Sequence, residues 1–301
     1  MISDSYFEQG STHEVCEDYA VHGESNGKMY SIVSDGCSNG GGPKIDSDWG
    51  SRILCKSAEE FIEFIDDNPE AFINLVSNRS KNLMLSLPNL SPACLTATLM
   101  VLHVCNDAFK VLTIGDGVVG GKKKDGTWTI NVIKFPRGPF YLKYKTFKEE
   151  QNFVNEFGNK YVIESYSGDI MSPEMAAPEN PKYEERMIEW KKHMRYSQNE
   201  LVVDLNHPYN TFEFPVSEYE FVFVCSDGIE SFSKLQIDKT SKHNESICVC
   251  DALRVVMEFV NIRQSFARIQ RKWAFKQDKA GTLLRRKWKN TDDVSVGVIH
   301  V

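Results

Sequence analysis

Apolar residues alternate with polar ones, or run without a break, in five short stretches that predict β-strands. These stretches cover residues 28–34, 95–104, 109–115, 219–225 and 294–301. The second and third are joined by Cys105-Asn-Asp-Ala108, a connection short enough to predict an antiparallel hairpin. Over residues 48–65 the apolar positions instead recur three and four apart, which predicts an amphipathic helix ending before Asp66-Asp-Asn-Pro69.

The order of these elements indicates the class of fold. Strands follow strands through hairpins and helices come in separate blocks, so the regular strand and helix alternation of a doubly wound parallel sheet is missing. The pattern favours an α/β protein of the layered α+β kind, built on antiparallel sheets. With 301 residues, of which 41% are hydrophobic, the chain can bury a substantial core.

Composition narrows the function classes. The net charge of −7 argues against nucleic acid or a membrane surface as a partner, because both attract a basic excess. The sequence has no apolar run near about 18 residues and no charged leader followed by an apolar stretch, so we expect neither a membrane span nor secretion. The eight cysteines include no Cys-x-x-Cys pair, and we expect reduced thiols in a cytoplasmic protein.

Four short acidic motifs stand beside the ends of predicted strands: Glu17-Asp18, Asp35-Gly36, Asp227-Gly228 and Asp292-Asp293. Each Asp-Gly pair taken alone is first of all a turn signal. Aspartates that converge in one cleft repel one another unless a hard divalent cation neutralises them, and oxygen ligands suit Mg²⁺ or Mn²⁺. The number and order of the motifs therefore indicate a carboxylate metal site.

With Gly115-Asp116 as a fifth piece, the order of motifs resembles, from end to end, the metal-dependent protein phosphatases, the type 2C serine/threonine family. The combination of His13, Cys37 and Asp48-Trp-Gly resembles a bacterial or phage-type branch. The resemblance implies a single catalytic domain over residues 1–301. It also implies two packed antiparallel sheets with helices on both outer faces, and metals at one end of the sandwich.

The resemblance also implies roles for the acidic residues as ligands of two Mg²⁺ or Mn²⁺ ions. Asp35 matches the Asp that bridges both metals, and Gly36 matches the Gly that offers its backbone carbonyl. Asp227 and Asp292 match the other direct ligands.

Three further acidic positions have weaker roles by the same resemblance. Glu17 and Asp18 match a pair that holds metal-bound waters, and we count both among the catalytic residues. Asp116 matches the Asp of a third, weaker metal site, although a turn between two strands explains Gly115-Asp116-Gly117 equally well.

Three positions depart from the family pattern. His13 stands where an Arg usually holds the substrate phosphate; a protonated His could take that role with a single contact, or Arg52 could fill it. Cys37 replaces a His, and we interpret it as a supporting residue because the loop lacks the Arg that a cysteine-dependent phosphatase needs. Asp293 replaces an Asn, which adds negative charge.

The function these residues favour is hydrolysis of phosphoserine and phosphothreonine in a phosphoprotein by a water that bridges two divalent metals. The alternative is a pseudophosphatase that keeps the fold but acts as a binding or regulatory module. The sequence does not predict the oligomeric state.

Two segments stand apart from the motifs. Residues 165–200 contain three prolines and a charged run, and we predict a surface insertion. In the family a mobile flap lies in this interval, although an excursion without function explains the segment equally well. Residues 261–289 are locally basic with apolar residues at helical spacing, which predicts a helix on the sheet with a solvated cationic face rather than a nucleic-acid-binding helix.

Overall fold

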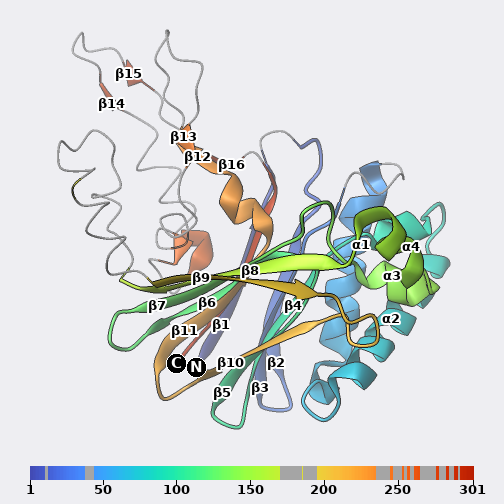
Figure 1. Ribbon diagram of the computed structural model, residues 1–301, viewed down its shortest axis with the longest axis horizontal. Coiled ribbons are helices and arrows are strands. Elements are labelled where there is room, and N and C mark those ends of the chain that lie inside the picture. The colour runs from blue at the N-terminus through green and yellow to red at the C-terminus, as the bar shows by residue number, and fades with distance from the viewer. Residues whose placement is uncertain are drawn as a thin grey trace.

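Two antiparallel β-sheets pack face to face at the centre of the computed structural model (Figure 1). The seven-stranded sheet has the order β1-β17-β11-β6-β7-β8-β9, and the five-stranded sheet has the order β10-β5-β4-β3-β2. The structure describes residues 1–10, 13–37, 44–169, 185, 195–234, 245–246, 253, 256–257, 261–264, 276–277, 283–284, 288–290 and 292–301.

The strands of the larger sheet are β1 (Ile2–Glu8), β6 (Gly117–Lys123), β7 (Trp128–Lys134), β8 (Lys160–Gly168), β9 (Arg195–Val202), β11 (Tyr219–Cys225) and β17 (Val294–His300). Those of the smaller sheet are β2 (Tyr19–Ser25), β3 (Lys28–Ser34), β4 (Leu99–Cys105), β5 (Ala108–Ile114) and β10 (Asn210–Pro215). Short strands form two small additional sheets: β12 (Phe232–Lys234), β13 (Glu245–Ser246) and β16 (Trp288–Asn290) in one, β14 (Lys276–Gln277) and β15 (Leu283–Leu284) in the other.

Four helices gather at one side of the molecule in Figure 1: α1 (Lys44–Glu60), α2 (Pro69–Ser86), α3 (Leu142–Phe147) and α4 (Glu150–Phe157). Single 3₁₀ turns cover Ile62–Phe64, Pro92–Leu95 and Asp227–Ser231. Helix α1 packs on β2, β3 and β4. Helix α2 begins at Pro69 because the Asn68 side chain accepts a hydrogen bond from the Ala71 N–H at 3.0 Å. In the described part of the chain, no helix is long and apolar enough to cross a bilayer.

The core has two layers, and the pleat of β11 shows why. Val222 and Val224 point between the two sheets, whereas Phe221 and Phe223 alternate with them and face the other side. On that outer face they pack with apolar residues in helical conformation near the C-terminal end, namely Leu253, Val256 and Ile262. Helical residues therefore cover both sheets, and the predicted α-β-β-α sandwich is confirmed.

Most predicted elements appear within a few residues of their predicted bounds. Strands β3 and β11 coincide with the predicted ranges, and the hairpin between β4 and β5 is confirmed. Asn106 and Asp107 have φ of 49° and 58° there, as a two-residue turn of this hand requires. Strand β4 begins later than predicted because Pro92–Leu95 form a 3₁₀ turn, and α1 begins earlier, at Lys44.

The structure describes the segments 165–200 and 261–289 only in part. The ends of residues 165–200 belong to β8 and β9, which pair with each other, while 170–184 and 186–194 lie outside the described residues. A helix throughout 261–289 is wrong, because described residues of this segment form β14, β15 and the start of β16. Strand β16 pairs with β12, far away in the sequence, and a local pattern does not show such a partner.

Candidate active site

The predicted acidic residues meet at one end of the sandwich, in a cavity of about 750 Å³. They reach it from five places in the chain: the loop before β2, the end of β3, the β5–β6 turn, the end of β11 and the turn before β17. The cavity is lined by His13, Glu17, Asp35, Gly36, Asp116, Asp227 and Asp292. The remaining predicted residue, Asp18, is fully buried beside Asp35.

Asp35 and Gly36 directly follow β3, and the segment before β4 fixes their backbone. The Asp35 N–H donates to the Thr98 hydroxyl at 3.0 Å, and the Thr98 N–H donates to the Asp35 carbonyl at 2.9 Å. Gly36 forms an isolated bridge with Ala97. The Asp35 carboxylate is therefore carried by a backbone held on both sides.

Asp116 occupies the turn between β5 and β6. Gly115 and Gly117 flank it with φ of 95° and 134°, a region that side chains rarely adopt. A Cβ at Gly117 would also lie 2.6 Å from the Cys225 carbonyl at the end of β11. The two glycines thus let this turn approach β11 closely, which brings Asp116 beside Asp227.

Asp227 leaves the end of β11 at a point tied to the start of β17. The Ser295 N–H donates to the Ser226 hydroxyl at 2.9 Å, and the Ser226 N–H donates to the Ser295 carbonyl at 3.0 Å. Gly228 packs so closely that a Cβ there would overlap the Asp293 carbonyl. The Ser-Asp-Gly sequence therefore places Asp227 against the motif that precedes β17.

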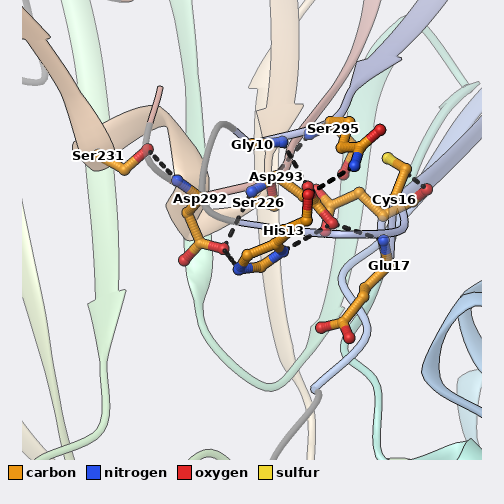
Figure 2. A network of polar contacts seen from close by, with 11 residues as sticks. Gly10, His13, Cys16, Glu17, Ser226, Ser231, Asp292, Asp293 and Ser295 are labelled. Carbon is orange, nitrogen blue, oxygen red and sulfur yellow. Dashed lines mark hydrogen bonds and ion pairs between the residues drawn. The ribbon is translucent and has the colours of Figure 1, made fainter. Parts of the chain in front are cut away.

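A polar network joins the N-terminal loop to that last motif (Figure 2). His13 Nε2 lies 3.2 Å from Asp292 Oδ1, and His13 Nδ1 lies 3.0 Å from Asp293 Oδ2. The buried Asp293 carboxylate also accepts the backbone N–H groups of Gly10 and Glu17, each at 2.5 Å. In Figure 2 the Glu17 side chain points away from Asp293.

This network links two of the departures from the expected pattern. His13 and Asp293 contact each other, so the added negative charge of Asp293 meets the imidazole and two backbone donors. Burial by itself would lower the pKa of His13, but the hydrogen bond to Asp293 and the charges of Asp293 and Asp292 outweigh burial and raise it. This agrees with the geometry, in which each ring nitrogen of His13 faces a carboxylate.

Comparison with known proteins identifies the family. The sequence profile described as Protein phosphatase 2C matches residues 9–263. The chain belongs to the protein phosphatase 2C family. The match ends before Asp292, yet the fold brings Asp292 into the same cavity as the matched acidic residues. A comparison with curated protein sequences found no match.

Solved phosphatases share the architecture at low identity. A bacterial serine phosphatase has a TM-score of 0.51 and 10% identity, with 100% of this chain and 98% of that chain covered. Serine/threonine phosphatase Stp1 from Staphylococcus aureus has a TM-score of 0.48 and 9% identity, covering 99% and 94%. PstP from Mycobacterium tuberculosis has a TM-score of 0.45 and 12% identity, covering 100% and 98%. At 10% identity, the first likeness shows the phosphatase 2C fold and nothing about activity.

Four acidic residues at the cavity are crowded together and largely buried. Burial and the charges of Asp18 and Asp227 raise the pKa of Asp35 well above its usual range. Burial and Asp227 raise the pKa of Asp116 to about 8, and burial raises the pKa of Asp18 to about 7. Burial and the charge of Asp292 likewise raise the pKa of Asp227. The cluster favours neutral carboxyl groups unless positive charge joins it.

The donor set fits a hard divalent cation by its chemistry. It consists of carboxylates and a glycine carbonyl, and neither oxygen of the buried Asp18 carboxylate has a hydrogen-bond partner of good geometry among the described residues. In the described part of the chain, however, no three His, Cys, Asp or Glu side chains are arranged so that they could hold a metal ion together. The residues fit in type and charge, while their side chains are not in coordinating positions.

Sequence inspection missed a second wall of the cavity, formed by the loop after β7 and by α3 and α4. Arg137, Tyr141 and Lys143 line the cavity from this wall. Tyr141 is buried with its hydroxyl in hydrogen-bonding reach of the Cys37 thiol, and burial and Cys37 raise the pKa of Tyr141. The only signal was the run Phe135-Pro-Arg-Gly-Pro-Phe140, which indicates a turn and no chemistry.

Arg52 lies outside the residues that line the cavity, whereas Cys37 is one of them. The Arg52 guanidinium lies 4.8 Å from the Tyr19 ring centre and 5.8 Å from that of Phe7. Within the described residues all six cysteines are free thiols.

Proposed function

We propose that this chain is a divalent-cation-dependent protein phosphatase acting on phosphoserine and phosphothreonine in a phosphoprotein. Membership of the protein phosphatase 2C family supports a phosphatase. The observation that carries the proposal is the meeting of acidic residues from five places in the chain within one cavity. Because Asp35 comes from one sheet and Asp227 from the other, we also infer that residues 1–301 act as one catalytic domain.

Four residues would hold two Mg²⁺ or Mn²⁺ ions: Asp35, the Gly36 carbonyl, Asp227 and Asp292. Asp116 would hold a third. The bound ions would lower the pKa of a water molecule and neutralise charge on the phosphoryl oxygens.

The remaining acidic residues would hold the water. Glu17 lines the cavity from the N-terminal loop, where its carboxylate can accept hydrogen bonds from water. Asp18 is buried next to Asp35, where its carboxylate would accept hydrogen bonds from water held at the ions.

Two observations favour a second candidate, a catalytically inactive module that binds phosphoproteins. The acidic side chains are not in coordinating positions among the described residues. The side chain at the position of the usual phosphate-binding Arg is His13, and its nitrogens face Asp292 and Asp293. A module of this kind would keep the cavity and lack turnover.

Hydrolysis of p-nitrophenyl phosphate and of a phosphothreonine peptide separates the two candidates. We expect turnover with Mn²⁺ or Mg²⁺, none with EDTA, and none by Asp35→Ala with either metal. Glu24→Gln, an exposed substitution on β2, serves as the control and should behave as wild type. Absence of turnover by folded wild-type protein with both metals would leave the binding module as the function.

A further inference from the structure

A phosphate monoester brings about 1.5 to 2 negative charges at neutral pH, and it must enter a cavity lined by carboxylates. Such a group needs a positively charged side chain besides any metal ion. The two candidates from the sequence already have other partners. His13 has a carboxylate at each ring nitrogen, and Arg52 lies against two aromatic rings outside the cavity.

Arg137 and Lys143 bring positive charge into the same cavity from the wall formed by the β7–α3 loop and α3. The half-buried Lys143 ammonium donates to the Thr96 hydroxyl at 3.2 Å and lies 5.4 Å from the Tyr144 ring centre. Among the described residues no carboxylate forms an ion pair with Lys143 or Arg137. By contrast Lys145, two residues further along α3, is paired with Glu70 at 2.6 Å.

The wall that carries these two cations is held by aromatic packing. Phe135 stacks on Tyr161 with ring centres 5.1 Å apart, and Phe140 meets Phe153 edge-on at 5.1 Å. A Cβ at Gly138 would lie 2.9 Å from the Phe157 ring, so the loop sits tightly on the end of α4. Prolines on both sides of Arg137-Gly138 further restrict the backbone. The backbone that carries both cations is thus held in place before any substrate arrives.

We propose that Lys143 and Arg137 bind the phosphoryl group of the substrate, in place of an Arg at position 13. This inference rests on the proposed phosphatase function. Thr96 orients the Lys143 ammonium, which has two further N–H donors for phosphoryl oxygens, and the exposed Arg137 guanidinium offers a two-pronged contact at the rim. The cation that recognises phosphate therefore comes from the helical wall rather than from the N-terminal loop.

The test compares Lys143→Met, Arg137→Gln and the double variant with wild type in Mn²⁺. Two quantities are measured: the KM for p-nitrophenyl phosphate and the inhibition constant of inorganic phosphate. We expect both to rise about tenfold in each single variant and more in the double variant, with kcat changing less than about threefold. Lys143→Arg should stay within about threefold of wild type because it keeps the charge.

Lys145→Met is the matched control, since it removes the same charge from the same helix but faces Glu70. It should leave both constants unchanged. Thermal unfolding of all variants tests whether Lys143 only stabilises the fold through its contact with Thr96. A Lys143→Met protein with wild-type KM and phosphate inhibition but a lowered melting temperature would overturn the proposal.

Calorimetric titration with inorganic phosphate in Mn²⁺ separates this proposal from the proposed function. If wild type lacks turnover but binds phosphate, and Lys143→Met binds it at least about tenfold more weakly, the phosphate site stands and the enzymatic function fails. If wild type turns over substrate and the double variant matches it in KM and phosphate inhibition, the enzymatic function stands and the proposed site fails.

Discussion

Strand β3 joins two acidic centres of opposite character. At its first residue, Lys28 is paired with Asp66, which also lies 3.4 Å from Lys110. Burial would raise the pKa of Asp66, but the hydrogen bond from Lys28 and the charges of His103 and Lys28 together outweigh burial and lower it. Just beyond the last residue of β3, burial and the neighbouring carboxylates raise the pKa of Asp35 well above its usual range. The ends of this strand are about 20 Å apart.

The difference teaches that the charge beside a poorly hydrated carboxylate decides its ionisation. In the Asp66 cluster, defined here as Asp66, Lys28, Lys110 and His103, the two lysines neutralise the one carboxylate, and no cation from outside is needed. The cavity acids repel one another, which is a cost to the fold that an external cation removes. We therefore expect the first centre to matter for stability and the second for activity.

The largest effect is expected from a substitution that removes one cavity carboxylate. Asp227→Asn should lower kcat/KM by at least about 1,000-fold, because a ligand of the proposed ions is lost. Without metal its free energy of unfolding should equal or exceed that of wild type, because the raised pKa of Asp227 shows that its charge is unfavourable in the fold. Urea unfolding in EDTA and initial rates in Mn²⁺ measure the two quantities. A large loss of stability with retained activity would break the comparison.

Removing the balanced carboxylate should have the reverse effect. Asp66→Asn leaves Lys28 and Lys110 without their shared partner, and the free energy of unfolding should fall by about 3 kcal/mol. The kcat/KM should change less than about threefold, because the cluster lies at the far end of β3. Glu220→Gln, which breaks an exposed pair with Lys122, should cost less than about 1 kcal/mol and serves as the control for urea unfolding.

The sequence predicted one of these centres and missed the other for a physical reason. Asp35 and Asp227 each follow an uninterrupted apolar strand, and this pattern is visible locally. The Asp66 cluster unites the turn before α2 with residues of β3, β4 and β5, so only strand pairing shows that its members meet.

The same limit applies inside the candidate site. Asp293 was interpreted as added negative charge, because its partners His13, Gly10 and Glu17 are more than 270 positions away and come together only through the pairing of β1 with β17. Lys143 was not singled out, because a lysine in a basic, aromatic helix resembles an ordinary surface residue. Its distinguishing feature is the missing carboxylate partner among the described residues, and this is a property of the fold.

A divalent cation should stabilise the fold through the cavity acids and not through the Asp66 cluster. At a concentration about 100 times its dissociation constant, Mn²⁺ should add about 2.7 kcal/mol to the free energy of unfolding of wild type and raise the melting temperature by about 5 °C. The gain should vanish in Asp227→Asn and persist in Asp66→Asn. Differential scanning calorimetry with Mn²⁺ or EDTA measures it. An equal gain in both variants would place the ion outside the cavity and contradict the comparison.

The smallest effect concerns His103, which is buried in the Asp66 cluster. Burial lowers its pKa to about 4, despite the opposing charge of Asp66, and it also faces Lys28 and Lys110, with Glu213 lining the same pocket. Acidification protonates His103 in the unfolded chain near pH 6.5 but in the folded chain only near pH 4. Stability is therefore lost as the pH falls between these values, by about 2 kcal/mol at pH 5 relative to pH 7.

The variant His103→Gln isolates this contribution, because the cavity acids titrate alike in both proteins and cancel in the difference. Urea unfolding at pH 7 and pH 5 should show a smaller loss for His103→Gln than for wild type, by about 2 kcal/mol. Asp66→Asn should leave the loss between pH 7 and pH 5 almost unchanged, because a His103 with a pKa of about 4 in the fold is already nearly neutral at pH 5. Equal losses in wild type and His103→Gln would mean that His103 is protonated as easily in the fold as outside it, which would contradict its burial as a neutral imidazole in the Asp66 cluster.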